Sequence, residues 1–324
     1  MKRRAWKLGF AVSFIALGAL VRFVQAQPFP VGPISLVIPL APGDAGDIAA
    51  RAMGEALSRL LKTPVLAVNR PGAGGAVGTN GVVQARKDGH TILFTPNSAL
   101  TFRAVLDPQS VTYDALRDLT PLGTASRTPS MLVVRADGPF KNFAAFMDYA
   151  KKMPGQIRTA HPGAGSVGEF SLQLISALTG VALLPVPYSG AAPAVVALRG
   201  GHVDAVVLSI GALSTHIRSG VFRGIVTSSR SAEFADIQTL RELGYREDLF
   251  GIWFSFFAPV GIPDDARKAL ISAIEQAVES PAITAKLAPL GIAQSYGSPE
   301  KTAAEIREEF KRVSEMARKT GLVK

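Results

Sequence analysis

The sequence has no cysteine, only 4 histidines and few aromatic residues. Without cysteine there can be no disulfide, thiol nucleophile, thiolate metal site or cysteine-linked lipid anchor. The histidines, His90, His161, His202 and His216, are too far apart in the chain for metal-ligand spacing. Aromatic residues make up 7% of the chain and the basic residues are scattered, which argues against a nucleic-acid-binding surface. We therefore expect no metal site, no cofactor and no nucleic-acid partner.

Long apolar runs are also lacking, except near the start of the chain. A basic N-terminal segment precedes the apolar run 8–21, whose 14 residues are too few to cross a bilayer. Val24 and Ala26 occupy the small-residue positions before a cleavage point, so residues 1–26 read as a signal peptide and Gln27 as the mature start. We expect a soluble periplasmic protein. Removing five positive charges and no negative one lowers its net charge from +10 to +5.

The mature chain would have 298 residues, enough for two domains. Short apolar runs alternate along it with stretches of helical period, which predicts an α/β fold of parallel strands covered by helices. The apolar runs include 34–40, 65–68, 91–94, 131–134, 203–210 and 225–227. Near the C-terminus, 302–320 has the clearest helical stripe, and we expect its apolar members to be core residues. They are Ala303, Ile306, Phe310, Val313 and Ala317.

Three glycine-rich loops follow expected strands and precede expected helices. They span 42–47 (PGDAGD), 70–78 (RPGAGGAVG) and 162–168 (PGAGSVG). Such loops let a ligand approach the backbone, and the unpaired amides at a helix start suit a carboxylate or phosphate. Because ligands bind at the carboxyl ends of strands in open α/β sheets, these loops predict a binding site.

The second loop also invites comparison with a dinucleotide-binding motif, through Gly72, Gly74 and Gly78. Pro71 disturbs the tight turn which that motif needs, and the strand 91–94 is followed by no acidic residue for a ribose hydroxyl. The pattern therefore favours a structural turn.

The third loop offers the best case for an enzyme. Residues 164–168 (AGSVG) are one alanine away from a nucleophile elbow, and Ser166, Asp204 and His216 follow in the chain order of an esterase triad. The triad would leave over 100 residues after it, which is unusual spacing for that fold. Ser166 is better explained as a helix N-cap or an anion-binding hydroxyl, and no catalytic residue is expected.

Taken together, the landmarks of this sequence resemble those of the Bug receptors, the extracytoplasmic subunits of tripartite tricarboxylate transporters. The matching segments are 37–43 (VIPLAPG) with Asp47 and Arg51, 68–75 (VNRPGAGG), 88–91 (DGHT), Gly165-Ser166, 186–190 (VPYSG), 200–204 (GGHVD), Trp253 and 258–259 (AP). They cover nearly the whole mature chain, and their order is more specific than any single glycine loop.

The resemblance implies a type II periplasmic binding fold, in which two α/β lobes close on a ligand held between them. It places 27–126 and 229–324 in the first lobe and 127–228 in the second. It also implies a binding protein for a small organic acid, without catalysis, that delivers the ligand to membrane permease subunits or to a sensor kinase. No dimerisation stripe is apparent in the sequence, so we expect a monomer.

The resemblance carries over a set of positions that line or shape the cleft. They are Leu40, Gly43, Asp47, Asn97, Ser166, Tyr188 and Asp204, to which we add Gly168 of the third loop. Each also has a plain structural explanation: Asp47 could cap a helix, Asn97 could end a strand and Asp204 could face solvent.

Two residues depart from the family pattern. Asp44 stands where a second glycine is usual, and Glu169 stands where histidine is frequent. If both face the ligand, they oppose a simple dicarboxylate and favour an ammonium or amide group. The alternative is that each carboxylate stabilises the start of the helix that follows it.

Overall fold

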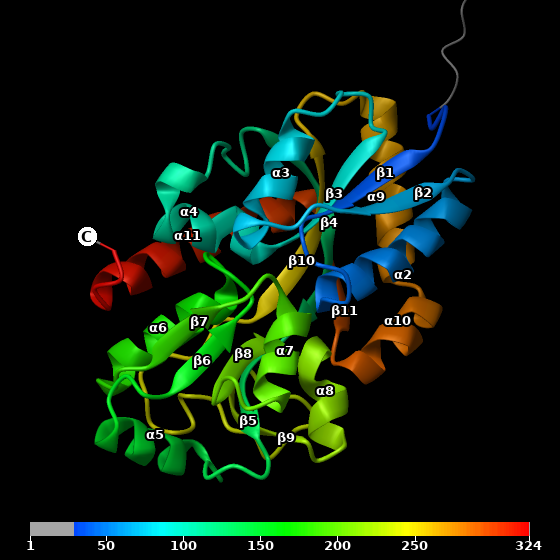
Figure 1. Ribbon diagram of the computed structural model, residues 1–324. Helices are drawn as coiled ribbons and strands as arrows, with labels where there is room; N and C mark the ends of the chain where they lie inside the picture. Colours follow the sequence, from blue (N-terminus) through cyan, green and yellow to red (C-terminus); the bar gives the residue numbers. More distant parts are fainter. Residues whose placement is uncertain (1–28, 324) are drawn as a thin grey trace, which may run out of the picture.

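The computed structural model describes residues 29–323. The expected signal peptide and the expected start at Gln27 lie outside these residues. Within them, two α/β lobes lie one above the other in Figure 1.

The first lobe is built on a sheet of six strands in the order β11-β4-β10-β3-β1-β2. The strands are β1 (Ile34–Ile38), β2 (Val65–Asn69), β3 (Thr91–Pro96), β4 (Leu119–Thr128), β10 (Ile252–Pro259) and β11 (Ala293–Gly297). Strand β1 is rich in β-branched residues and buries both faces, as a central strand with helices on each side should. Leu36 and Ile38 pack under one layer of helices, and Val37 packs under the other.

Six α-helices belong to the segments that build this sheet. They are α2 (Ala45–Leu60), α3 (Ala76–Val83), α4 (Arg103–Leu106), α9 (Asp264–Val278), α10 (Pro281–Leu287) and α11 (Pro299–Lys319). Four short helical turns accompany them: η2 (Ala73–Gly75), η3 (Ser98–Phe102), η4 (Pro108–Ser110) and η5 (Ala288–Leu290).

The second lobe has a sheet of five strands in the order β7-β6-β8-β5-β9. Its strands are β5 (Ser130–Arg135), β6 (Arg158–His161), β7 (Leu184–Pro187), β8 (Ala205–Ser209) and β9 (Phe222–Thr227). Its helices are α5 (Phe143–Lys152), α6 (Val167–Thr179), α7 (Ala191–Arg199) and α8 (Ile210–Arg218).

The expectation of purely parallel strands is wrong for both sheets. Strand β10 runs antiparallel to β3 and β4, and β5 runs antiparallel to β8 and β9. Strands β5 and β10 each receive the chain directly from the other lobe, so no covering helix returns it to a parallel course.

The chain crosses between the sheets twice. It leaves β4 at Thr128 and enters β5 at Ser130, and it leaves β9 at Thr227 and returns to the first sheet at Ile252. Between these last two strands, the apolar side chains of 229–251 pack into the cores of the second lobe; they are Phe234, Leu240, Leu249 and Phe250. We propose the two-lobe division on this basis, with 229–251 attached to the second lobe in space.

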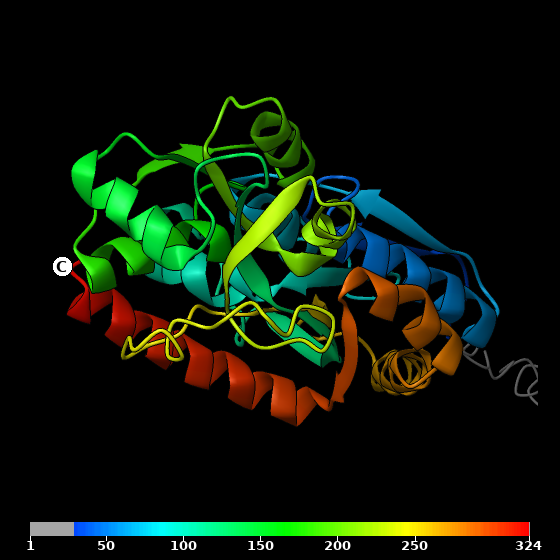
Figure 2. The ribbon, with the colours of Figure 1, turned by 90° about the horizontal axis from the view of Figure 1, so that it is seen from below.

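Helix α11 contacts both lobes. Ile306 packs beneath the first sheet, whereas Val313 and Ala317 pack into a core of the second lobe. Figure 2 shows this helix, coloured red, running along one side of the molecule. The prediction that Phe310 is a core residue is wrong: its side chain is 44% exposed, and Glu309 is buried in its place.

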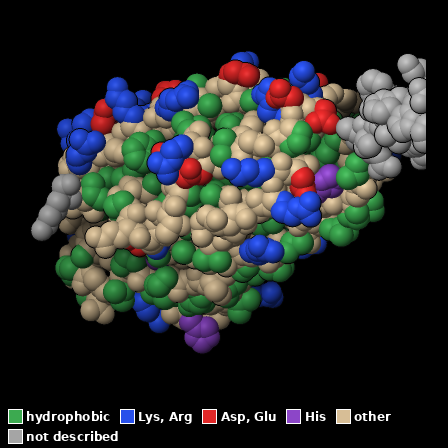
Figure 3. Space-filling model, turned by 90° about the horizontal axis from the view of Figure 1, so that it is seen from above, with side chains coloured by type: hydrophobic (Ala, Val, Ile, Leu, Met, Phe, Trp, Pro, Cys, Tyr) green, Lys and Arg blue, Asp and Glu red, His purple; other side chains and the backbone are tan. Residues whose placement is uncertain are grey.

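The surface and the interior carry no sign of a metal centre or a membrane span within 29–323. No group of three His, Asp or Glu side chains there could hold a metal ion. None of the described helices has both the length and the apolar character needed to cross a membrane. On the face in Figure 3, Lys and Arg side chains are interspersed with Asp and Glu.

Candidate functional site

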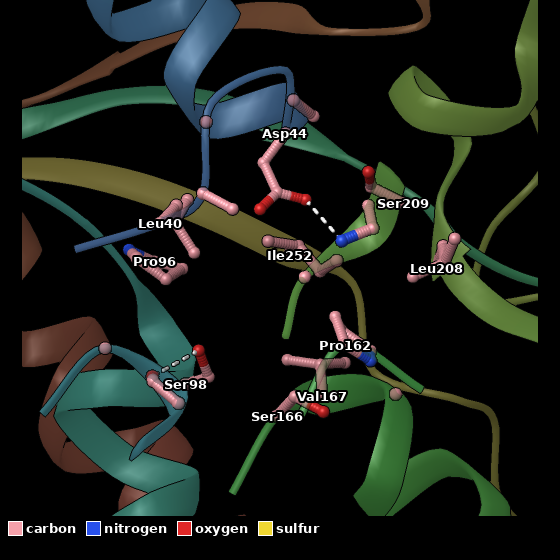
Figure 4. A pocket seen from close by; sticks show the side chains of 18 of the residues that line it. Leu40, Asp44, Pro96, Ser98, Pro162, Ser166, Val167, Leu208, Ser209 and Ile252 are labelled. Carbon is pink, nitrogen blue, oxygen red and sulfur yellow. Dashed lines mark hydrogen bonds between the residues drawn. The ribbon is translucent and has the colours of Figure 1, made fainter. Parts of the chain in front are cut away.

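A cavity lies between the two lobes, at the carboxyl ends of β1, β3, β6 and β8 (Figure 4). The centres of water-sized molecules can occupy about 90 Å³ of it. All three glycine-rich loops contribute to its wall, together with the first turns of α2, α6 and α7. The site expected from the sequence therefore lies where the two sheets face each other.

The β1–α2 loop is held in shape by Asp47. Its carboxylate accepts hydrogen bonds from Gly43 N at 3.0 Å, from Asn69 Nδ2 at 2.8 Å and from Arg51 Nε at 3.0 Å. Although burial raises it, these bonds hold the pKa of Asp47 below its ordinary value. Gly43 has φ +85°, a conformation that favours glycine. Asp47 and Gly43 thus shape the loop, and neither is part of the cavity wall.

Asp44 lies in the cavity wall and joins the two lobes. It is the N-cap residue of α2, but its side chain makes no capping bond there. Instead its Oδ1 accepts a hydrogen bond of 3.0 Å from the amide of Ala191, the first residue of α7 in the second lobe. Burial raises the pKa of Asp44 to about 6, against the hydrogen bonds from Ala191 and Ala41, and nearby Asp47 raises it further.

The third loop ends in a variant of the capping box, in which Glu169 accepts from the residue before the N-cap. Ser166 Oγ accepts a hydrogen bond from Glu169 N at 3.2 Å, and Glu169 Oε2 accepts one from Gly165 N at 2.6 Å. Glu169 is turned toward the loop backbone and does not line the cavity. The first two residues of α6, Val167 and Gly168, line the cavity, and their amides precede the first intrahelical hydrogen bond.

We expect Glu169 to contribute to stability and not to ligand choice. Glu169→Ala should lower the free energy of unfolding by about 1 kcal/mol, because Gly165 N loses its acceptor and α6 loses a favourable charge at its start. Urea unfolding measures this loss. Glu169→Gln is the matched control, since it keeps an oxygen for Gly165 N and should change stability by less than alanine does. A change in ligand affinity with Glu169→Gln would contradict the assignment.

The lobes touch closely beside the cavity. A Cβ placed on Gly74 of the first lobe would lie 2.6 Å from the carbonyl oxygen of Ala164 in the second. A Cβ on Gly165 would lie 2.2 Å from Cδ of Arg103, across the same boundary. These glycines allow the lobes to approach through their backbones, so the structure has the lobes in contact around the cavity.

Besides Gly43, Asp47 and Glu169, three further expected residues lie away from the cavity wall. Asn97 is buried behind it and donates to Glu309 Oε1 at 2.8 Å. Tyr188 packs against a core of the second lobe. Asp204 is an outer-surface partner of Arg158, whose Nε and Nη2 each lie 3.0 Å from its oxygens.

Of the ten expected positions, Leu40, Asp44, Ser166 and Gly168 line the cavity. Their contact with ligand stays a prediction. The sequence analysis missed other wall residues, namely Ser98, Ser130, Ser189 and Ser209. Ser209 ends β8 and directly precedes α8, so the strand-end rule could have found it. Ser130 lies at the crossover between lobes, a position that no local pattern marks.

The esterase alternative finds no assembled triad among the described side chains. Ser166 Oγ caps α6, the Asp204 carboxylate binds Arg158, and the His216 ring packs 5.0 Å from that of Phe222. His161 lies nearer to Ser166 in the chain, but it is buried with Nδ1 3.1 Å from the Gly163 carbonyl. Burial lowers the pKa of His161, partly offset by Glu169.

A second hollow, with room of about 610 Å³, lies along the crossover segments and α11. Several of its charged side chains already have partners: Arg127 forms a two-bond pair with Glu305, and Arg312 lies 5.1 Å from the centre of the Phe250 ring. No sequence-predicted site residue lines it. The cavity between the lobes is therefore the better candidate.

Comparison with known proteins decides the family. Residues 49–322 match the model of the tripartite tricarboxylate transporter family receptor. The chain belongs to this family. BugT of Bordetella pertussis is 33% identical over 310 residues, which cover 95% of each chain.

Solved structures of receptors give the same result for the fold. The periplasmic binding protein BugD superposes with a TM-score of 0.85 at 28% identity, covering 91% of this chain and 99% of its own. MatC of Rhodopseudomonas palustris, solved with bound malate, superposes with a TM-score of 0.83 at 29% identity, covering 89% and 99%. The expected type II periplasmic binding fold and Bug-family membership are confirmed. Receptors of this family are periplasmic solute-binding proteins.

Proposed function

We propose that this receptor captures a small organic acid in the periplasm and delivers it to the membrane permease subunits of a tripartite tricarboxylate transporter. The observation that carries the proposal is the cavity wall, which contains first-turn residues of α2 from one lobe and of α6 from the other. The amides of such residues bind anions through their hydrogen atoms and through the positive end of the helix dipole. Ser166, Val167 and Gly168 are the proposed partners of the ligand carboxylate.

The size of the cavity fits a small acid. About 90 Å³ is several times the roughly 10 to 15 Å³ that a cavity needs to hold one water. Malate, the ligand in the MatC structure, belongs to this size class. The apolar wall residues, among them Leu40 and Phe254, would cover the carbon chain of the acid.

We further propose that the receptor works as a monomer and that its lobes move apart to release the ligand. Both lobes contribute to the wall, so the ligand stabilises the arrangement in which they touch. The crossovers near Pro129 and 228–251 are the segments where rotation can occur.

The function is tested by a thermal-shift screen of the mature protein with carboxylates, amino acids and amides. We expect a subset of small acids to raise the melting temperature, since a ligand at 100 times its Kd adds about 2.7 kcal/mol to the free energy of unfolding. Ser166→Ala should weaken this shift. Turnover of a simple ester that is lost in Ser166→Ala would instead support the serine hydrolase.

Delivery is tested separately. Receptor-dependent uptake of the identified acid by membrane vesicles that carry the permease would support transport. Activation of a membrane sensor kinase by the loaded receptor, without uptake, would support the signalling alternative and contradict delivery to a permease.

A further inference from the structure

Asp44 is the one ionisable side chain among the residues that line the cavity. The other wall residues are apolar, glycine or serine. No Lys or Arg of the described chain forms an ion pair with Asp44, and Arg51, about two turns further along α2, is bound to Asp47 and Asn69. The formal charge that the wall presents to a ligand is therefore negative.

The Asp44 carboxylate has acceptor capacity left for a ligand. One backbone amide, that of Ala191, donates to it at 3.0 Å. An ionised carboxylate offers about four acceptor sites, so roughly three remain. Figure 4 shows the carboxylate pointing into the cavity, with Ser166 and Val167 on the other side of the opening.

The position of Asp44 also removes one anion site. Its oxygen occupies the start of α7, where the amide of Ala191 would otherwise face the cavity. A ligand can thus place a carboxylate at the start of α6 but meets a fixed carboxylate at the start of α7. With a pKa of about 6, raised by burial and by Asp47, Asp44 is largely ionised at neutral pH.

We propose that Asp44 is a specificity-determining residue that selects acids carrying a hydrogen-bond donor, an ammonium or an amide, at the end away from their carboxylate. The inference rests on the proposed function, because it names the ligand class of the same cavity. A donor pairs with the remaining acceptor sites through a charge-assisted hydrogen bond, whereas a second ligand carboxylate meets like charge.

The test compares acids that differ only in the end group. Succinate, its monoamide succinamate and γ-aminobutyrate are titrated calorimetrically into the mature protein at about pH 7.5, and the comparison is repeated with glutarate and its monoamide. The parent should bind the amide or the amine at least about tenfold more tightly than the dicarboxylate. In Asp44→Asn, the side-chain oxygen still accepts from Ala191 N, while an NH₂ group replaces the second carboxylate oxygen. The ratio of the affinity for the amide or amine to the affinity for the dicarboxylate should therefore fall about tenfold or reverse.

Glu169→Gln provides the matched control, because it removes a carboxylate of the neighbouring loop that does not line the cavity. It should leave the ratio unchanged. Equal ratios in the parent and Asp44→Asn, or a parent that prefers the dicarboxylates, would overturn the role of Asp44 and leave the receptor function standing. If neither these probes nor the wider screen of acids binds the parent, the receptor function itself fails, and the inference with it.

Discussion

Replacing Gly74 with alanine is expected to weaken ligand binding by roughly 10- to 100-fold, because the lobes could no longer meet. The added Cβ would lie 2.6 Å from the backbone oxygen of Ala164, a contact that no side-chain rotation can relieve. The clash would hold the two lobes apart, by a fraction of an ångström to several ångströms. A ligand that contacts both lobes would then lose its contacts with one of them. Calorimetry with an acid identified in the screen measures the loss.

Backbone strain must be separated from this effect, since Gly74 has φ +62°. Gly180→Ala is the matched control: Gly180 has φ +71°, and a Cβ there meets no atom within 4 Å. Both variants should lose a similar, small amount of stability, on the order of 1 kcal/mol. Only Gly74→Ala should lose affinity for the ligand. Its small-angle scattering profile with ligand present should show a molecule as expanded as in the absence of ligand. Parent-like affinity in Gly74→Ala would show that binding does not need the lobes to touch here.

Glu309→Ala is expected to lower the free energy of unfolding by about 3 to 5 kcal/mol. Glu309 is buried on α11 and accepts hydrogen bonds from Asn97 Nδ2 at 2.8 Å and from Trp253 Nε1 at 3.0 Å. Truncation leaves Trp253 Nε1 buried without its acceptor, leaves Asn97 Nδ2 with the Gly251 carbonyl as its one remaining acceptor, and opens a cavity where α11 crosses from one lobe to the other. Urea unfolding monitored by Trp fluorescence measures the change. A loss below about 1 kcal/mol would mean that water or rearrangement satisfies these donors.

The same carboxyl should make stability depend on pH. Burial raises the pKa of Glu309 to about 7, although its three hydrogen-bond donors lower it. The neutral form fits, because Thr101 Oγ1 can donate to the Asn97 carbonyl at 2.9 Å and accept from a protonated Glu309. This contribution is complete below the ordinary pKa near 4.5 and is lost as pH rises through about 7.

Glu309→Gln isolates that contribution. Its amide oxygen can accept from Asn97 and Trp253, and its NH₂ group can donate to Thr101, as protonated glutamic acid does. We expect it to match the parent near pH 5 and to exceed it by up to about 3 kcal/mol near pH 8. Asp44 titrates in the same direction in both proteins, so the difference between them reports Glu309. An identical pH profile in the two would show that Glu309 stays ionised in the folded state.

Much of the fold and the location of the site were accessible from the sequence. Apolar runs alternating with helical periods predicted the α/β class, and the glycine loops after strands predicted where the cleft would lie. These patterns depend on neighbours within a few residues, through side-chain alternation, helix period and the φ angles that only glycine adopts readily. The strand directions of β5 and β10 were not accessible, because they depend on how the chain passes between lobes.

The roles of the individual acidic residues show where local patterns stop. Asp44 looked like a cap for α2, yet it accepts from Ala191, 147 residues further along the chain. The apolar stripe of α11 predicted that Phe310 would be buried, but Glu309 is buried instead. Its carboxylate is accommodated there because Asn97, which follows β3, and Trp253 of β10 supply hydrogen-bond donors. Asp204 forms an ion pair with Arg158 outside the cleft.

The sequence by itself thus determined the fold class, the three glycine-rich loops that contribute to the cavity wall and the family to which the chain belongs. Only the tertiary structure decided which carboxylate faces the cavity, which one caps a helix and which one is buried at the crossing of α11. The physical reason is that backbone conformation and capping are set by adjacent residues, whereas the burial and partners of a charge are set by whatever packs against it from elsewhere in the chain.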